Sequence, residues 1–386
     1  MIIKNVTVYG EDKRFREDEI AIKNGVFSKM SDDCADEIID GEGCYAIPGL
    51  IDLHFHGCKG FDFCDGTKKA ITEIAKYEAS VGVTCIAPAT MTLPVEELEH
   101  ILSVAAEYNK EAAGRDPKEQ AKYADLVGIN MEGPFISESK KGAQNAHHIL
   151  TCDSSVCRKF LASSEGLVKF VGLAPECSEK AIEFICEMKD KVHISLAHTN
   201  ADYDTAKAAY DAGADHAVHL YNAMPPFTHR EPGVVGAVLD SPHVSAEIIC
   251  DGVHIHPSAV RAAFQMMGAD RMIFISDSIR AAGMPNGQYT LGGLDVNVEG
   301  NRATLKSNGA LAGSATNLMD CMRIAVREMG IPLETAIACA TINPAKKLGI
   351  YEQYGSITFG KKGNVVLLDK DLNVKLVIKD GVKLQL

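Results

Sequence analysis

Two histidines close an apolar run near the start of the chain, in the segment PGLIDLHFHG at residues 48–57. Side chains of an extended strand alternate between its two faces, so His54 and His56 point in the same direction. Two imidazoles that converge in this way are a natural pair of ligands for a metal ion. Taken alone, the pair is also compatible with a strand end that meets solvent.

Four further residues with metal-binding or acid-base side chains also end apolar runs: Glu132, His198, His219 and Asp277. Glu132 and Asp277 could instead cap helices. His198 and His219 could be half-buried structural histidines. Their shared position at the ends of apolar runs favours chemistry over these alternatives. Other histidines lack that position and are expected to be structural or on the surface: His100, His193, His216, His243 and His256.

The residue types indicate a particular reaction. Neutral imidazoles together with a carboxylate suit Zn²⁺ or Fe²⁺. When one coordination position stays open, such an ion lowers the pKa of bound water towards about 7. Asp277 would take a proton from that water and then protonate the leaving nitrogen. The pattern therefore predicts metal-assisted hydrolysis of an amide, with Asp277 as the catalytic base and acid.

These residues can meet only if the fold brings the strand ends together. Short runs rich in Val and Ile alternate with helical periodicity, which indicates a parallel sheet covered by helices. The candidate strands span 49–56, 83–90, 125–134, 168–176, 192–199, 216–224, 245–255 and 271–278, and candidate helices span 68–82, 95–112, 178–191, 201–214 and 256–270. Eight such units predict an α/β fold, a (β/α)₈ barrel of TIM type, whose catalytic residues lie at the C-terminal strand ends.

Both ends of the chain have a different pattern. Residues 1–48 and 353–386 alternate in short bursts separated by turn residues, which predicts antiparallel hairpins. We expect them to pair into one small β-sandwich domain, with the barrel over 49–352. A further β-hairpin insertion is predicted near 287–312, over the barrel mouth. The charged stretch 111–125 lacks a periodic apolar face and is expected to be a solvated loop.

The composition narrows the class of protein. A chain of 386 residues with 46% hydrophobic and 24% charged residues is typical of a globular protein. A net charge of −13 disfavours nucleic acid as a partner. The chain shows no signal segment and no run long enough to span a membrane, so we expect a cytoplasmic protein without membrane contact. The 12 cysteines are irregularly spaced and are expected to be reduced.

Several segments together carry a resemblance to a known family. They are PGLIDLHFHG, MEGPF with KKGA, LAPE, LAHTNA, HAVHLYNAMPPFTHREPGVVGAVLD, CDGVHIHP, FISDS, LAGS, and NPAKKLGI with GSITFGKKGNVVLLD. Over essentially its full length the chain resembles the N-acetylglucosamine-6-phosphate deacetylases of the amidohydrolase superfamily. The stretch from His219 to Asp240 is the most specific part of this resemblance.

The resemblance implies roles for individual residues. Glu132, His198 and His219 would bind the primary metal, and Asp277 would be the general base and acid. The sugar phosphate of the substrate would meet Asn222, the backbone at Ala223, His254 and Arg230. The resemblance also implies a homodimer, with Arg230 reaching across to the neighbouring subunit.

Two features distinguish this chain within the family it resembles. Some members lack both strand-one histidines, whereas His54 and His56 are present here, so a second metal with Glu132 as the bridge is expected to be possible. Where some members have a histidine that polarises the acetyl carbonyl, this chain has Gln144. A second metal, His147 or Gln144 itself could assume that function. One or two divalent ions are expected, and zinc, iron, manganese and cobalt all remain open.

Alternative functions remain at this stage. The resemblance implies an enzyme that removes acetate from N-acetylglucosamine 6-phosphate and yields glucosamine 6-phosphate. The alternative substrate N-acetylgalactosamine 6-phosphate differs from it at one hydroxyl group. A dihydroorotase-like or adenine-deaminase-like enzyme would leave His254 and Arg230 without a purpose. A non-catalytic relative that binds sugar phosphates would have no need of Asp277.

Overall fold

The computed structural model describes residues 1–30 and 37–384, and its centre is a curled parallel sheet. One part joins seven strands in the order β16-β15-β14-β13-β12-β11-β9, and a second part joins β10-β8-β5. The strands are β5 (Leu50–Asp52), β8 (Val83–Ile86), β9 (Ala89–Thr90), β10 (Asp125–Leu126), β11 (Ile129–Phe135), β12 (Val168–Leu173), β13 (His193–Leu196), β14 (His216–Ala217), β15 (Ser245–Ile249) and β16 (Met272–Ile275). Every residue of β11 and β16 is buried, as expected for strands covered on both faces.

The two outer strands of this curled sheet, β5 and β16, meet just beyond their C-terminal ends. The N–H of Asp277 donates to the carbonyl of His54 at 3.0 Å, and the N–H of His56 donates to the carbonyl of Ser278 at 2.7 Å. These bonds hold the segments after β5 and β16 side by side. They bring the histidine pair and Asp277 to the same edge of the sheet.

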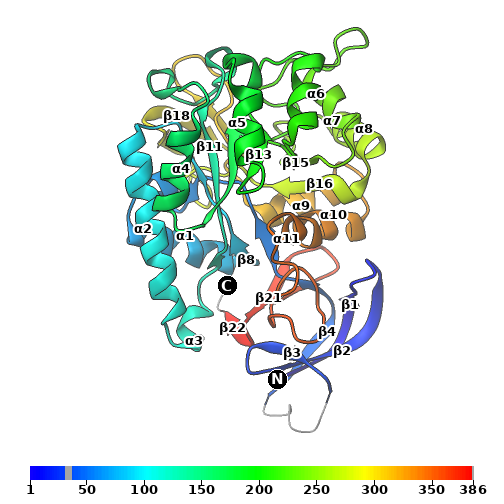
Figure 1. Cartoon of the computed structure of the whole chain (residues 1–386). Helices are drawn as coiled ribbons and strands as arrows, with labels where there is room; N and C mark the ends of the chain where they lie inside the picture. Colours follow the sequence, from blue (N-terminus) through cyan, green and yellow to red (C-terminus); the bar gives the residue numbers. More distant parts are fainter. Residues whose placement is uncertain (31–36, 385–386) are drawn as a thin grey trace.

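Helices pack around the outside of the sheet (Figure 1). They are α1 (Lys68–Ser80), α2 (Val95–Ala113), α3 (Pro117–Gln120), α4 (Ser154–Ser163), α5 (Ala181–Met188), α6 (Tyr203–Ala212), α7 (Gly233–Leu239), α8 (Pro257–Met267), α9 (Leu318–Arg327), α10 (Leu333–Ala340) and α11 (Ile342–Lys347). Several begin at side-chain caps that the sequence contains. Thr67 accepts from Ala70 N–H, and Asn317 accepts from Asp320 N–H.

The prediction of a solvated loop at 111–125 is wrong in part, because two helical segments lie within this stretch. Helix α2 continues to Ala113, and α3 follows after Asp116, whose side chain caps it in front of Pro117. An Asp followed by Pro is a helix-start signal that the absence of an apolar face concealed. The Arg115 guanidinium lies over the rings of Tyr108 and Tyr123, so part of this polar segment is held against the surface.

Strands from both termini form one seven-stranded sheet, drawn in blue and red at the bottom of Figure 1. Its order is β22-β21-β20-β4-β1-β2-β3, with β1 (Ile2–Tyr9), β2 (Phe15–Lys23), β3 (Val26–Ser28), β4 (Ile38–Pro48), β20 (Val365–Leu368), β21 (Val374–Lys379) and β22 (Val382–Leu384). The prediction of antiparallel pairing alone is wrong at one place, because β1 and β4 are parallel.

The terminal sheet curls so that its β3 edge reaches the segment before β20. Phe27 N–H donates to the carbonyl of Lys361 at 2.8 Å, and Gly360 N–H donates to the carbonyl of Phe27 at 2.9 Å. Inside the curl, side chains from both termini share a core of their own, which includes Ile3, Ile20 and Val365. The terminal segments therefore depend on each other for burial of their apolar side chains.

The insertion after β16 has one strand more than the predicted hairpin. It is an antiparallel sheet of β17 (Gly287–Leu291), β18 (Leu294–Glu299) and β19 (Arg302–Leu305). Two shorter strands, β6 (Gly57–Cys58) and β7 (Phe61–Asp62), form a small pair directly after the histidine pair.

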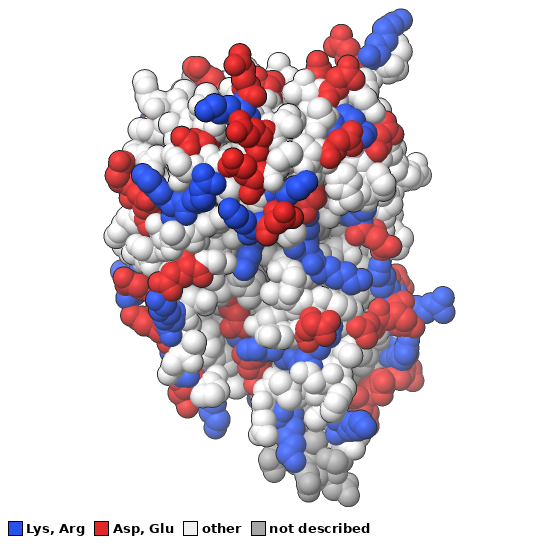
Figure 2. Space-filling model, viewed as in Figure 1, with Lys and Arg blue, Asp and Glu red and all other residues white. Residues whose placement is uncertain are grey.

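Cysteines and surface charges agree with the composition. The described cysteines are free, and most are buried. On the face in Figure 2, Lys and Arg side chains are interspersed with Asp and Glu. Over the described ranges, the helices are all too short or too polar to cross a lipid bilayer.

A buried ion pair links the terminal sheet to strand β10 of the parallel sheet. Lys379 on β21 is fully buried, and its Nζ lies 2.9 Å from Asp125 Oδ1 and 2.8 Å from Asp380 Oδ2. Asp125 on β10 also accepts from the Tyr354 hydroxyl at 3.0 Å. Burial opposes the charge of Asp125, but Lys379 and Lys362 outweigh burial and lower its pKa.

We predict that Lys379→Met lowers the free energy of unfolding by about 3 kcal/mol, because it removes the nearer of the two described cations that face the buried Asp125 carboxylate and leaves only Lys362, with its Nζ at 3.8 Å. Adding Asp125→Asn removes the poorly compensated charge and is expected to restore more than half of the loss. Urea denaturation of the wild type, both single variants and the double variant measures the effect. A Lys379→Met variant as stable as the wild type would contradict this role of the pair.

Candidate active site

A cavity of about 300 Å³ opens at the C-terminal edge of the parallel strands. Nine of the predicted site residues line it: His56, Glu132, Gln144, His198, His219, Asn222, Ala223, His254 and Asp277. A larger cavity of about 940 Å³ lies between the terminal sheet and the α2–α3 segment. Its wall mixes basic and acidic side chains, and the clusters of potential metal ligands lie at the smaller cavity.

Glu132, His198 and His219 form the first cluster of potential ligands. One carboxylate oxygen, Glu132 Oε1, lies 2.9 Å from the Nε2 atoms of both histidines, and these two Nε2 atoms are 3.2 Å apart. The Nδ1 of His198 faces the carbonyl of Lys140 at 2.8 Å, and the Nδ1 of His219 faces the carbonyl of Asn222 at 3.1 Å. Because a carbonyl can only accept, each Nδ1 carries a proton.

With Nδ1 protonated, neutral His198 and His219 direct Nε2 lone pairs at the same carboxylate oxygen. Lone pairs that face each other in a buried place repel unless a positive charge lies between them. A proton or a metal cation meets that need, and imidazole nitrogen with carboxylate oxygen is a donor set that divalent transition metals accept. The residues of the first cluster therefore fit a divalent metal.

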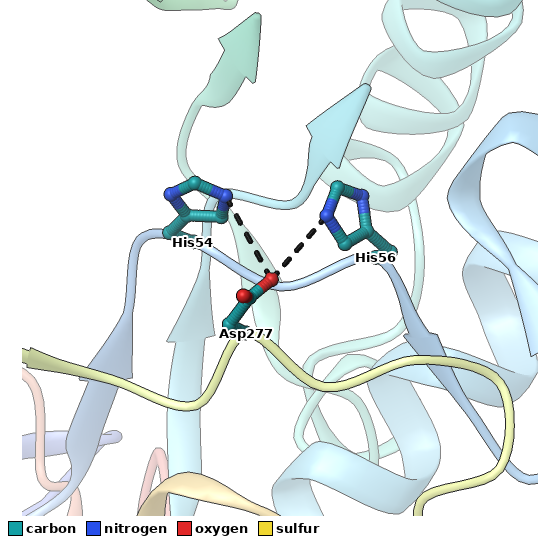
Figure 3. A group of neighbouring side chains, drawn as sticks. All are labelled: His54, His56 and Asp277. Carbon is teal, nitrogen blue, oxygen red and sulfur yellow. Dashed lines mark ion pairs between the residues drawn. The ribbon is translucent and has the colours of Figure 1, made fainter. Parts of the chain in front are cut away.

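His54, His56 and Asp277 form the second cluster (Figure 3). Both rings point at the Asp277 carboxylate, with Oδ1 at 3.4 Å from His56 Nε2 and 4.0 Å from His54 Nε2. Glu132 lies between the clusters, because its Oε1 is 3.4 Å from His54 Nε2 and its Oε2 is 3.3 Å from His56 Nε2. The two clusters thus share one carboxylate.

The buried carboxylates of the site attract positive charge, whether protons on the histidines or a metal ion. Burial raises the pKa of Glu132, but His198 and His54 outweigh burial and hold that pKa well below its ordinary value. Burial alone would lower the pKa of His56, whereas Asp277 and Glu132 raise it to about 10. The buried carboxylates stabilise protons on these rings when no metal is bound. The same electrostatic attraction favours a cation that replaces those protons.

Three potential ligand or acid-base residues have a left-handed backbone, which side chains other than glycine rarely adopt, and Ala223 shares it with a φ of 53°. The φ angles are 45° at His198, 28° at His219 and 49° at Asp277. Such conformations cost on the order of 1–3 kcal/mol each and persist where the surroundings fix them. Here hydrogen bonds fix them: Ser137 N–H donates to the His198 carbonyl at 2.9 Å, and Ser314 N–H donates to the Asp277 carbonyl at 2.7 Å.

The residues predicted to meet a sugar phosphate fall into two groups. Asn222, Ala223 and His254 line the cavity. Asp251 accepts from His254 Nδ1 at 2.7 Å, which leaves Nε2 of that ring free to contact a ligand. Arg230 and His147 are exposed and lie outside the described lining of the cavity.

Gln144 lines the cavity, with both ends of its amide held by the protein. Its side chain is buried, its Nε2 donates to Glu132 Oε2 at 2.7 Å, and its Oε1 accepts from Thr92 N–H at 2.6 Å. Both ends of the amide are therefore engaged with the protein, and the side chain holds the shared carboxylate in place.

Three residues of the site were missed by reasoning from the sequence. Glu247 lies within β15 and contacts His54, Asp251 orients His254, and Lys140 lines the cavity while its carbonyl orients His198. A signal for Glu247 was present, because a carboxylate inside the apolar run SAEIIC has to be buried with partners. His216, expected to be structural or on the surface, is buried against Glu247.

Comparison with known proteins gives a consistent result. The sequence profile of the amidohydrolase family matches residues 45–384. The chain is 35% identical to the N-acetylglucosamine-6-phosphate deacetylase of Bacillus subtilis (strain 168), over 99% of this chain and 96% of that protein. It is 34% identical to the N-acetylgalactosamine-6-phosphate deacetylase of Escherichia coli O157:H7, over 86% of each.

A solved structure extends the similarity to the fold. The crystal structure of N-acetyl-D-glucosamine-6-phosphate deacetylase from Mycobacterium smegmatis superimposes with a TM-score of 0.90 at 28% identity, over 100% of both chains. The matched profile covers both clusters of potential ligands and the strands that carry them. The chain belongs to the amidohydrolase family.

Proposed function

We propose that this protein is a metal-dependent deacetylase that hydrolyses N-acetylglucosamine 6-phosphate to glucosamine 6-phosphate and acetate. The observation that carries the proposal is the junction of Glu132, His198 and His219 beside Asp277 at one cavity. The similarity to deacetylases of amino-sugar phosphates over nearly the whole chain supports this substrate class. Metal-dependent hydrolysis is the chemistry that the donor set favours.

Glu132, His198 and His219 would hold the primary divalent ion. A bound ion of this kind lowers the pKa of a water molecule and polarises a carbonyl oxygen. His54 and His56 would hold a second ion, with Glu132 between the two positions. Zinc, iron, manganese and cobalt all accept these ligands, so the donor set leaves the choice among them open.

Asp277 would move the proton. Its carboxylate faces the same cavity as Glu132, and its burial is compensated by His56 and His54, which lower its pKa. An ionised Asp277 can take a proton from the attacking water as the bond to the acetyl carbon forms. It then gives that proton to the sugar nitrogen as the C–N bond breaks, so that the amine leaves in a neutral form.

The phosphate would bind in the same cavity as Asp277, at residues of the loops that follow the strands. Asn222, the backbone at Ala223 and His254 would supply its contacts, and Asp251 would hold His254 with its free nitrogen towards the substrate. Arg230 would contribute from the partner subunit of a homodimer. Its exposed position in the loop before α7, which rises beside α6 in Figure 1, supports a contact outside its own subunit.

The architecture that would support this function is a complete barrel. The hydrogen bonds between the segments after β5 and β16 support closure of a (β/α)₈ barrel over 49–352, with an insertion near 287–312. Residues 1–48 and 353–386 would form the β-sandwich domain, supported by the contacts of β3 with residues 360–361. The free cysteines support a cytoplasmic location.

A second candidate substrate is N-acetylgalactosamine 6-phosphate. The observation that favours it is the similarity of 34% to a deacetylase of that epimer, almost as high as to the glucosamine enzymes. The difference between the epimers is one hydroxyl orientation. A binding protein without catalysis would fit the same cavity but would leave Asp277 without a role.

We predict selective release of acetate from N-acetylglucosamine 6-phosphate by the metal-loaded protein. The unphosphorylated sugar is expected to lose at least tenfold in kcat/KM, because it lacks the charge-assisted hydrogen bonds that His254 and Arg230 would make. An acetate assay on both sugars and on the galactosamine epimer tests this. Preference for the epimer would select the second candidate, and no release from any of the three would contradict both.

Replacement of Asp277 by Asn is predicted to lower kcat by about 10²–10⁴, because the amide cannot accept and return the proton. Substrate binding is expected to persist, since the phosphate contacts are untouched. Turnover together with calorimetric titration of substrate separates the two effects. Retention of full kcat would rule Asp277 out as base and acid.

Acidification is predicted to release the metal. Imidazole must be neutral to bind, and Asp277 and Glu132 raise the pKa of His56 to about 10, so protons already compete with the ion near neutral pH and compete more strongly as pH falls. Metal content and activity should fall together on acidification or after chelation, and both should return when metal is added at pH 7.5. Full activity after removal of all metal would contradict a metal-dependent reaction.

A further inference from the structure

Glu247 is a fully buried carboxylate in the middle of β15, inside a run of apolar residues. Glutamate is almost never fully buried without partners, because desolvation of the charge costs several kcal/mol. Around this carboxylate the structure places four hydrogen-bond donors. It is the most fully hydrogen-bonded carboxylate described near the cavity, and the proposed reaction does not use it.

Each oxygen of Glu247 has two of these donors. Oε2 lies 2.7 Å from His54 Nδ1 and accepts from His219 N–H at 3.2 Å. Oε1 lies 2.9 Å from His216 Nε2 and accepts from Asn130 Nδ2 at 3.2 Å. The carboxylate is therefore fixed in one orientation, and a single oxygen touches a histidine from each of the two clusters.

The contact with Glu247 decides which nitrogen of His54 can bind a metal. Nδ1 donates its proton to the carboxylate, so Nε2 is the nitrogen left to bind a cation. That Nε2 is buried and has no hydrogen-bond partner among the described residues. It is directed at Glu132 and Asp277, at 3.4 Å and 4.0 Å. This nitrogen is therefore available to bind a metal ion, because no described protein group satisfies it.

The first cluster is positioned differently. His198 and His219 donate Nδ1 protons to neutral backbone carbonyls, whereas His54 donates to an ionised carboxylate. A carboxylate acceptor increases the basicity of the opposite nitrogen and fixes the ring more firmly. In the second cluster, His56 Nδ1 has no hydrogen-bond partner in the described chain, so the order of this cluster depends mainly on His54.

We propose that Glu247 is a positioning residue that creates the second metal position at His54, His56 and Asp277. Through the backbone N–H of His219 it also ties that position to the first one. This inference rests on the proposed metal-dependent function and goes beyond it, because it names the residue that makes the site binuclear. Loss of Glu247 should convert a two-metal site into a one-metal site.

Glu247→Gln tests this. One amide oxygen cannot serve all four donors, and the amide NH₂ would face N–H groups. After reconstitution with Zn²⁺, elemental analysis and chelator competition should find two ions in the wild type. In the variant the second ion should bind about 10–100-fold more weakly, the usual effect of losing a carboxylate partner of a ligating histidine. The first ion should change much less.

His216→Gln is the matched control, because its amide can still donate to the other oxygen of Glu247 and it is not a proposed ligand. It should retain two ions. In a His54→Ala background, Glu247→Gln should add little further loss. Equal loss of the second ion in His216→Gln, or wild-type affinity for two ions in Glu247→Gln, would overturn the proposal.

Two measurements keep the test decisive if Glu247→Gln fails to fold. Nitrogen NMR of the zinc-loaded wild type should find His54 protonated on Nδ1, and protonation on Nε2 would overturn the inference. Acetate release by the wild type is scored separately. A wild type that is active with one ion refutes this inference but leaves the proposed function intact, whereas two bound ions without turnover on any amino-sugar phosphate refute the proposed function.

Discussion

The structure of the site depends on repulsion between the lone pairs of two histidine nitrogens and one carboxylate oxygen, which a bound proton or metal cation removes. His198 and His219 donate their Nδ1 protons to backbone carbonyls, so their Nε2 atoms both face Glu132 Oε1 at 2.9 Å with lone pairs. Side chains held in this way cannot satisfy one another as neutral groups. Most other features of the cavity serve to hold this arrangement in place, including the buried amide of Gln144 against Glu132.

The strands and the packed core beneath them hold these side chains in position. Parallel strands bring their C-terminal ends to one edge, and the chain turns sharply there, with a left-handed backbone at His198, His219 and Asp277. Close-packed side chains beneath the edge, such as Phe170 and Ile249, resist relaxation of this strain. Other stabilising contacts lie away from the cavity. One is the buried ion pair of Lys379 and Asp125, which joins the terminal sheet to the parallel strands.

Much of the site could be predicted from the sequence because each residue's place follows from its position at the end of an apolar strand. A histidine or carboxylate at the end of an apolar strand has a predictable position once the strands are parallel, and this placed His54, Glu132 and His219 together. Contacts set by three-dimensional packing could not be predicted in this way. Glu247 lies within a strand, and its partners come from three other strands or strand ends. The parallel pairing of β1 with β4 likewise depends on the whole terminal sheet rather than on either strand.

Positions on loops were the least predictable. Arg230 and His147 have suitable chemistry, but surface segments carry few packing constraints, and both side chains are exposed. Anomalous diffraction from crystals of metal-reconstituted protein tests the metal position at Glu132 most directly. We expect a peak about 2.0–2.2 Å from Glu132, His198 and His219. A fully reconstituted crystal with no peak at these residues, or with its metal bound elsewhere, would contradict it.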